Sequence, residues 1–345
     1  MENRQPVSIG FIGNGKSANR YHLPFVMTRK DKFAVKMIYQ RHLGSNAWEK
    51  IPGAAYTDDL ERILNDPEIQ LLVISTPTES HVAMAKKVLE AGKHCLVEKP
   101  FATSVEEAEE LFRIAKAKNL MVQCYQNRRF DSDFLTTQQV IASGKLGRIF
   151  EVNMHYDYYR AYVPEGEPEY IRDHAFLYTH ACHTVDQVLS YFGQPNEVRS
   201  DVRQLLGSGR MNDYFDLDFF YDEMKVSVKS SYFRAKARPS FVVYGLRGMF
   251  VKEEQDRQEA DLKKFYLPEG HDDFGLDSPK EYGTLIYYDD QGTYHEEKVP
   301  SVRGDYGFYY DALYDTLMDG KPPLVTEEQT MAQMRILEEA GASLK

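Results

Sequence analysis

A glycine-rich turn near the N-terminus has the spacing of a phosphate-binding loop. Gly13-Asn-Gly15-Lys-Ser-Ala18 follows an apolar run at residues 7–12 and opens a stretch of helical composition. In a G-x-G-x-x-G/A turn, the first glycine permits a tight turn, the second lets the backbone approach a pyrophosphate, and the third small residue lets the helix pack closely on the strand. A glycine-rich turn without a ligand is the alternative. We expect a dinucleotide to be held by Gly13, Gly15, Lys16, Ser17 and Ala18.

The end of the second expected strand indicates which nucleotide this turn favours. About 20 residues beyond the glycines, NAD-binding sites carry an acid that hydrogen-bonds the adenosine ribose. Here the segment reads Tyr39-Gln-Arg41-His42 and contains no acid. The guanidinium of Arg41 can instead pair bidentately with a 2′-phosphate. The segment therefore favours NADP over NAD as the cofactor, and an Arg41 that is merely solvated is the alternative.

Two further segments carry side chains suited to proton and oxyanion chemistry. Glu98-Lys99-Pro100 follows the apolar run 94–97, at the edge where open α/β sheets bind ligands. On a helical wheel over residues 176–192, His180 and His183 point away from the apolar stripe. This i, i+3 pair lacks an identifiable third metal ligand, so we expect proton chemistry and no metal. A surface strand end and two surface histidines are the alternatives.

The elements that must position these residues follow one pattern up to residue 125. Short β-branched runs alternate with amphipathic segments, which is typical of a parallel sheet wrapped by helices. Strands are expected at residues 7–12, 33–39, 69–75, 94–97 and 121–125, and helices at residues 79–91 and 104–118.

Beyond residue 125 the pattern becomes that of an antiparallel sheet. Residues 150–159 alternate strictly between two faces, as in a strand with one wet side. Further strands are expected at residues 198–205, 214–221, 224–233, 240–245 and 284–288, and helices at 131–143, 176–192, 308–318 and 327–343. We therefore predict one domain over residues 1–124 and a second over residues 125–345.

Composition excludes several classes of protein. The 345 residues suffice for two domains that each bury a core. The net charge is −11 without a basic block, so neither nucleic acid nor an anionic membrane is an expected partner. No stretch approaches the roughly 20 apolar residues that span a bilayer, and the polar N-terminus does not suit a signal peptide, so we expect a cytoplasmic protein. The spacing of Cys95, Cys124 and Cys182 fits neither a disulfide framework nor a zinc site.

Taken together, the motifs resemble the Gfo/Idh/MocA family of NAD(P)-dependent oxidoreductases. The resemblance runs from the first strand to the closing helices. Its motifs are Gly13-x-Gly15-x-x-Ala18, Thr76-Pro77 with His81, Glu98-Lys99-Pro100, Asn127-Arg128-Arg129-Phe130 and His183-Thr-Val-Asp186. It is closest to a bacterial branch that shares residues 15–17, 20–24 and 125–131. The resemblance implies an α/β protein with an N-terminal Rossmann domain, which is a doubly wound parallel sheet, and a C-terminal α/β domain with a large, mostly antiparallel open sheet.

The resemblance also implies roles for single residues. By match, Lys99 and His183 bind the reacting hydroxyl or carbonyl, and His183 acts as acid and base. Many members carry an aspartate four residues before this histidine, where this chain has Thr179; the carboxylate is therefore missing, and His180 partly replaces it. Further cofactor-binding candidates are Thr76, Pro77, His81 and Glu98. Candidates for substrate contact are Arg128, Tyr156, Tyr158, Thr179 and His180, with Arg160 and Tyr178 beside them.

The function that this resemblance implies is hydride transfer between a nicotinamide and a sugar, polyol or related hydroxy or keto compound. Within the family, a glycosidase that retains its NAD is an alternative. From a different class, a non-catalytic nucleotide-binding sensor or regulator is another. The chain contains 24 tyrosines, and a wet tyrosine-rich sheet face suggests a homodimer or a homotetramer.

Overall fold

The computed structural model describes residues 5–44 and 48–344. Within it the chain divides into two compact units, each formed by three segments. The first unit comprises Met1–Asn127, Asp261–Phe274 and Tyr306–Met331, and the second comprises Arg128–Ala260, Gly275–Asp305 and Ala332–Lys345. The first unit thus takes in two late segments that follow residue 125 in the sequence.

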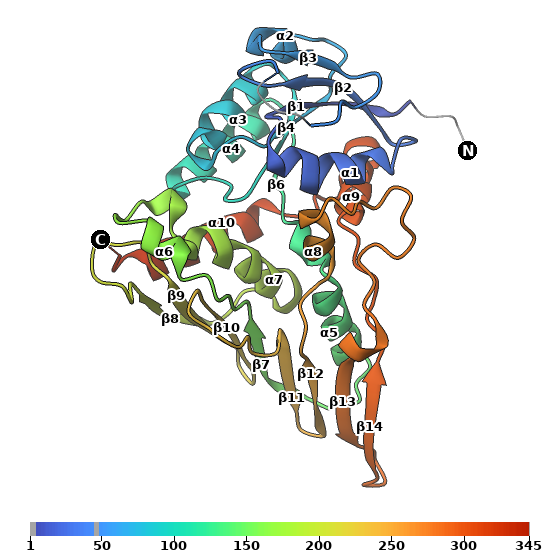
Figure 1. Cartoon of the computed structure of the whole chain (residues 1–345), viewed down its shortest axis with the longest axis vertical. Coiled ribbons are helices and arrows are strands. Elements are labelled where there is room, and N and C mark those ends of the chain that lie inside the picture. Colours follow the sequence, from blue (N-terminus) through green and yellow to red (C-terminus); the bar gives the residue numbers. More distant parts are fainter. Residues whose placement is uncertain (1–4, 45–47, 345) are drawn as a thin grey trace. The chain divides into compact units, whose positions relative to one another are not determined.

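A parallel sheet of six strands forms the centre of the first unit (Figure 1). In spatial order its strands are β3 (Ala55–Thr57), β2 (Phe33–Tyr39), β1 (Val7–Ile12), β4 (Leu71–Ile74), β5 (His94–Val97) and β6 (Val122–Cys124). Every neighbouring pair is parallel, and the order reverses between β1 and β4, so the sheet is doubly wound. The five expected strands are confirmed. The additional β3 spans three residues, which is too short for a recognisable apolar run.

Helices pack on this sheet, with α3 beside α4 and α1 beside α9. The helical segments of the first unit are η1 (Ala18–His22), α1 (Leu23–Met27), α2 (Leu60–Leu64), η2 (Thr78–Ser80), α3 (His81–Glu90), α4 (Val105–Ala117) and α9 (Gly307–Asp319). Helix α9 is part of the core of this unit, because Tyr309 and Tyr310 are fully buried and the Tyr309 hydroxyl donates to the carbonyl oxygen of Cys124 at 2.6 Å.

The second unit is built on an open sheet of eight strands (Figure 1). In spatial order these are β14 (Tyr294–Val299), β13 (Gly283–Tyr288), β12 (Gly248–Lys252), β11 (Phe241–Gly245), β7 (Ile149–His155), β10 (Lys225–Ser231), β9 (Tyr214–Phe220) and β8 (Glu197–Arg203). Only β7 and β10 pair in parallel, so the expected mostly antiparallel sheet is confirmed. Strands β12 and β14 were not expected from the sequence. β14 is a mostly exposed edge strand whose polar residues form no apolar run.

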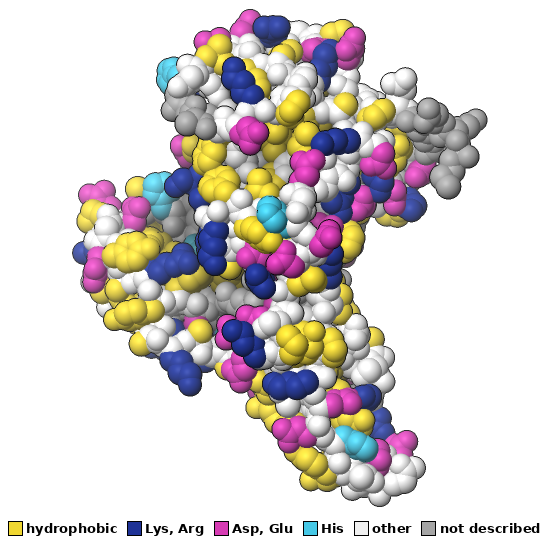
Figure 2. All heavy atoms as spheres, turned by 45° about the vertical axis from the view of Figure 1, so that its right-hand side comes forward, with side chains coloured by type: hydrophobic (Ala, Val, Ile, Leu, Met, Phe, Trp, Pro, Cys, Tyr) yellow, Lys and Arg dark blue, Asp and Glu magenta, His cyan; other side chains and the backbone are white. Residues whose placement is uncertain are grey.

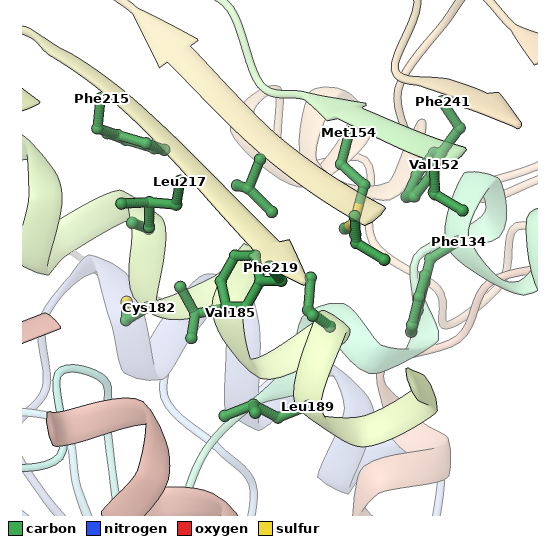
Figure 3. Packing of buried hydrophobic residues seen from close by; sticks show 14 of the residues in the cluster. Phe134, Val152, Met154, Cys182, Val185, Leu189, Phe215, Leu217, Phe219 and Phe241 are labelled. Carbon is green, nitrogen blue, oxygen red and sulfur yellow. The ribbon is translucent and has the colours of Figure 1, made fainter. Parts of the chain in front are cut away.

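Helices cover one face of this sheet, and both α5 and α7 contact its strands. The remaining helical segments are η3 (Asn127–Phe130), α5 (Ser132–Ala142), α6 (Tyr162–Gly166), η4 (Arg172–His174), η5 (Leu177–Ala181), α7 (Cys182–Phe192), α8 (Gln258–Lys263), η6 (Pro279–Glu281) and α10 (Glu327–Gly341). Figure 3 shows Cys182, Val185 and Leu189 of α7 facing the apolar side chains of the sheet, with Phe219 between them. The apolar stripe expected on this helix is therefore confirmed.

The opposite face of α7 is polar but buried. The helical wheel placed His183 away from the apolar stripe, yet His183 and its neighbour on this face, Gln187, are only 9% and 4% exposed. The face is polar but covered, because Gln187 donates a hydrogen bond to the carbonyl oxygen of Arg128 at 2.7 Å and Asp186 is paired with Arg129. The alternative of a surface histidine at position 183 is thus wrong, since a helical wheel shows which face of a helix is apolar and not which face is buried.

Membrane-spanning helices, charged surface patches and groups of metal ligands would each indicate a kind of partner. No helix among residues 5–44 and 48–344 is long and apolar enough to cross a bilayer. On the face seen in Figure 2, acidic and basic side chains are interspersed. Within the described part of the chain, no group of three or more His, Cys, Asp or Glu side chains is arranged to hold a metal ion, and the three buried cysteines form no disulfide.

Candidate active site

The phosphate-binding turn is shaped by its two glycines. Gly13 follows β1 with φ +114°, and a Cβ there would lie 2.5 Å from the carbonyl oxygen of Ser75. A Cβ at Gly15 would meet no atom within 4 Å. The first glycine is therefore required by the backbone, whereas the second leaves open space beside the turn. An open space next to exposed backbone at the carboxyl end of β1 fits the pyrophosphate of a dinucleotide.

Side chains of the turn reach the loop that follows β2. The Asn14 amide donates to the Gln40 side chain at 2.6 Å, and the Asn19 amide donates to Asn14 at 2.9 Å. Arg41 is the next residue after Gln40 and is exposed. Its guanidinium is thus accessible at the sheet edge where the adenosine ribose of a dinucleotide is bound in this fold. Binding of a 2′-phosphate by Arg41 stays a prediction.

A buried network joins the turn to the Glu98-Lys99-Pro100 segment at the end of β5. The Glu98 carboxylate accepts hydrogen bonds from the Ser17 hydroxyl, from His22 Nε2 at 3.0 Å and from the backbone N–H of Lys99 at 3.0 Å. His22 is fully buried, and its Nδ1 lies 2.7 Å from the Tyr310 hydroxyl. The backbone that presents Lys99 is therefore held by the same carboxylate that binds the phosphate turn.

The charge state of Glu98 follows from these partners. Burial raises the pKa of this carboxyl, but hydrogen bonds from His22 and Ser17 and the charges of His22 and Lys99 outweigh burial and lower its pKa to about 2. Glu98 is thus ionised at neutral pH and can only accept hydrogen bonds. His22 must therefore carry its proton on Nε2. Sequence analysis assigned no role to His22 or Tyr310, although His22 lies within the shared segment 20–24.

The other residues expected at the nucleotide site lie at the ends of β4 and β5. His81 is buried, with Nε2 2.9 Å from the carbonyl oxygen of Thr76 and Nδ1 2.8 Å from that of Pro100. Both ring nitrogens thus contact backbone, and His81 links the two strand ends. Thr76 is half-buried and Pro77 is exposed. Direct contact of these residues with a nucleotide stays a prediction.

The histidine helix begins with an irregular turn. Residues Leu177–Ala181 form a π-helical turn, η5, that runs into α7, where a single helix was expected. The Thr179 hydroxyl donates to the carbonyl oxygen of Ala175 at 3.0 Å and lies 2.9 Å from His180 Nδ1. Because this hydroxyl uses its proton on Ala175, it accepts from Nδ1 of His180. Nε2 of His180 lies 3.5 Å from the Tyr232 hydroxyl.

The five expected substrate residues form one continuous chain of contacts in the second unit. The Arg128 guanidinium lies 4.8 Å from the centre of the Tyr156 ring, and the rings of Tyr156 and Tyr158 are 5.5 Å apart. Tyr158 in turn lies 5.5 Å from the His180 ring, which contacts Thr179. Sequence reasoning thus selected residues that the fold brings together: the two tyrosines follow β7, Arg128 lies in η3, and Thr179 and His180 lie in η5.

Arg128 is less available for a ligand than expected. Its guanidinium pairs with Asp131 at 3.3 Å and with Glu259, which also accepts from the Tyr156 hydroxyl at 3.1 Å. Glu259 lies far along the chain from both partners, and no local motif marks it. The positive charge of Arg128 is therefore compensated within the protein.

Comparison with known proteins decides the family. The model described as "Oxidoreductase family, NAD-binding Rossmann fold" matches residues 7–126, and "Oxidoreductase family, C-terminal alpha/beta domain" matches residues 138–345. The chain belongs to the Gfo/Idh/MocA oxidoreductase family. The expected family, the fold class and an NAD-binding domain are thereby confirmed.

Relatives cover nearly the whole of this family member. The uncharacterized oxidoreductase YhhX of Escherichia coli (strain K12) is 44% identical over 96% of this chain and 95% of its own length. The scyllo-inositol 2-dehydrogenase (NADP(+)) IolW of Bacillus subtilis (strain 168) is 31% identical over 98% of this chain and 94% of its own. The crystal structure of an oxidoreductase from Bacillus cereus has a TM-score of 0.90 at 41% identity, covering 98% of this chain and 96% of the other.

Proposed function

We propose that this family member is an NADP-dependent dehydrogenase or reductase that acts on a CH–OH group of a sugar, polyol or related hydroxy or keto compound. The observation that carries the proposal is the buried Glu98 network, which ties the phosphate turn to the backbone of Lys99. Such a connection fixes a cation next to a nucleotide site. This arrangement suits a role in which the Lys99 cation acts on a substrate bound beside the nucleotide.

Lys99 and His183 have complementary roles in this proposal. The bound nicotinamide supplies hydride exchange. Lys99 donates a hydrogen bond to the reacting oxygen and stabilises the negative charge that develops there. His183 takes the hydroxyl proton during oxidation and returns it during reduction, as an imidazole side chain can do. Gly13, Gly15, Lys16, Ser17 and Ala18 hold the pyrophosphate.

Two observations support the nucleotide and the substrate class. The segment after β2 has Arg41 and no acid, which favours a 2′-phosphate. The relative IolW is named as an NADP(+)-dependent dehydrogenase of scyllo-inositol and matches over almost its whole length, which favours NADP and a polyol-like substrate here as well.

The open, tyrosine-bearing face of the eight-stranded sheet, with Tyr288 and Tyr294 about half exposed, favours a homodimer or homotetramer.

The test is a panel of cyclitols, sugars, sugar acids and their keto forms, assayed with NADP(H) and NAD(H) by nicotinamide absorbance. We expect turnover with at least one compound, and a loss of at least about 100-fold in kcat for Lys99→Met with nucleotide affinity retained. Turnover without added nucleotide by protein that retains NAD after purification would favour the glycosidase alternative. Nucleotide binding without hydride transfer to any compound would favour a sensor.

A further inference from the structure

Two arginines near the contacting rings of Tyr158, Tyr232 and His180 lack the carboxylate partner that Arg128 and Arg238 have. Arg128 is paired with Glu259, and Arg238 is paired with Asp157. Arg160 and Arg234, in contrast, form no ion pair with any residue in the described ranges. Both side chains are half-buried. A half-buried guanidinium without a carboxylate is costly unless a ligand supplies the negative charge.

The backbone holds these two arginines beside a pair of tyrosines. The Arg160 N–H donates to the carbonyl oxygen of Tyr232 at 2.9 Å, and the Arg234 N–H donates to that of Tyr158 at 2.9 Å. Both bonds flank an antiparallel bridge made by the residues that precede the two arginines. Residues on either side of a bridged pair share one face of the ladder. Arg160 and Arg234 therefore belong to the same face as Tyr158 and Tyr232.

Side-chain contacts agree with this register. The Arg160 guanidinium lies 4.5 Å from the centre of the Tyr158 ring, and the Tyr158 and Tyr232 rings are 5.7 Å apart. Both tyrosine rings contact the ring of His180, at 5.5 and 5.7 Å. The arginine face is thus continuous with the predicted substrate residues.

The chemistry of this face is that of hydrogen-bond donors. Burial raises the pKa of the Tyr158 and Tyr232 hydroxyls, so both keep their protons at neutral pH and can donate. Guanidinium groups are donors only and match the oxygen geometry of carboxylates and phosphates. In the described chain, no acidic side chain pairs with the two arginines to oppose such a ligand. A surface of cationic and hydroxyl donors selects an acceptor-only, negatively charged group.

We infer that Arg160 and Arg234 bind an anionic substituent of the substrate, a carboxylate or a phosphate, while its hydroxyl or carbonyl reacts. This inference rests on the proposed function and narrows it: the substrate is a sugar acid, or a phosphorylated polyol or sugar, and its uncharged counterpart binds more weakly. Arg160 and Arg234 are specificity-determining residues in this assignment, because they hold a group remote from the reacting carbon.

Matched pairs of compounds test the inference by isothermal titration calorimetry on protein saturated with NADP⁺, so that the nucleotide phosphates cannot be confused with the new site. The carboxylate pairs are D-gluconate with D-glucitol and D-glucuronate with D-glucose; the phosphate pair is myo-inositol 1-phosphate with myo-inositol. We expect the acid of at least one pair to bind about tenfold or more tightly than its neutral partner. Which pair shows the preference identifies the anion.

Variants separate a direct role from a structural one. Arg160→Gln and Arg234→Gln should each lower the affinity for the acid about tenfold and change that for the neutral partner less than twofold, whereas Arg160→Lys retains most of the preference. The matched control is Arg199→Gln, because Arg199 also lies over an aromatic ring, at 4.8 Å from Phe220, but is paired with Glu197. It should leave both affinities unchanged.

Each outcome decides the inference separately from the proposed function. Equal affinity within every pair, no binding of any acid, or an equal effect of Arg160→Gln on acid and neutral partner would overturn it. Arginine-dependent binding of an acid without nicotinamide oxidation or reduction would uphold the anion site and overturn hydride transfer. Turnover of neutral polyols alone, with no preference for acids, would uphold hydride transfer and overturn the anion site.

Discussion

The Asp186 carboxylate on α7 accepts two hydrogen bonds of 2.7 Å from the guanidinium of Arg129, with Arg129 only 8% and Asp186 only 3% exposed. This bidentate pair joins two of the family motifs, the segment 127–130 and the helix that carries His183. Burial raises the pKa of Asp186, and the Arg129 charge and hydrogen bonds act against that rise. The pair fixes the rotation of α7 and so the direction of its polar face.

Removal of one partner of this pair is expected to be costly. Arg129→Met should lower the free energy of unfolding by about 3–5 kcal/mol, because it leaves a buried carboxylate without its cation. The double substitution Arg129→Met with Asp186→Leu should recover most of that loss. Denaturant unfolding followed by circular dichroism measures both. Arg199→Met, at an exposed pair, is the control and should cost no more than about 1 kcal/mol; a similar loss there would contradict the argument.

The two glycines of the phosphate turn should respond differently. Gly13→Ala places a Cβ against the Ser75 carbonyl at positive φ, so it should destabilise the protein by about 1–3 kcal/mol. Gly15→Val should leave the unfolding transition unchanged and abolish nucleotide binding, because its side chain enters open space that a pyrophosphate would fill. Thermal melts and nucleotide titrations distinguish the two effects. Nucleotide binding by Gly15→Val at normal affinity would show that the turn is structural only.

Cofactor preference should depend on Arg41. We expect NADP(H) to bind at least about tenfold more tightly than NAD(H), and Arg41→Asp to reverse or erase that preference, since a carboxylate repels a 2′-phosphate and accepts from a 2′-hydroxyl. Fluorescence titration of both reduced nucleotides measures the ratio. The exposed Arg62, on α2, provides the control substitution Arg62→Asp. Equal affinity of the unaltered protein for both nucleotides would refute the prediction.

Stability at acidic pH should depend on Glu98. Its folded-state pKa of about 2 lies below the ordinary value of 4.5, so the carboxylate stabilises the fold above pH 4.5 and that contribution disappears as the pH falls toward 2. Glu98→Gln should therefore be less stable than the unaltered protein at pH 7, by roughly 3 kcal/mol, and the difference should shrink between pH 4.5 and 2. Unfolding measured across this range tests it. Glu269→Gln, at an exposed pair with Lys30, should show no such convergence.

Proton transfer should depend on His183. His183→Asn should lower kcat by about 100- to 10,000-fold while nucleotide affinity is kept. The pH–rate profile of the unaltered enzyme should show an ionisation that is missing in the variant. A normal rate with the same profile would mean that another group carries the proton. His174→Asn, at an exposed histidine of η4, is the control.

Local signals in the sequence predicted much of the fold. A helix was expected over residues 327–343, and α10 begins at Glu327, where Thr326 and Gln329 form reciprocal side-chain-to-backbone hydrogen bonds of 3.2 Å. Such signals lie within a few residues and depend on backbone geometry alone. The polar edge strand β14 was not predicted, because no local signal in its own residues marks a strand. Its pairing with β13 makes it one.

The site was less predictable where partners lie far apart in the chain. Glu98 was expected at the nucleotide site, but its bond to His22 joins residues 76 positions apart. The contact between Arg128 and Glu259 spans 131 positions. No spacing rule connects such pairs, since they meet only after both elements have packed. The π-helical turn at η5 was not expected either, because the segment was assigned the ordinary α-helical periodicity throughout.

The membership of α9 in the first unit bears on how such proteins can evolve. Tyr310 lies 186 positions after Cys124, where the last strand of the parallel sheet ends, yet its hydroxyl contacts His22 and its ring is fully buried there. A gene fusion that transferred only the stretch ending at β6 would leave the buried His22 without this helix. The nucleotide-binding half therefore cannot be exchanged as a continuous cassette, and recombination is expected to conserve the two halves together.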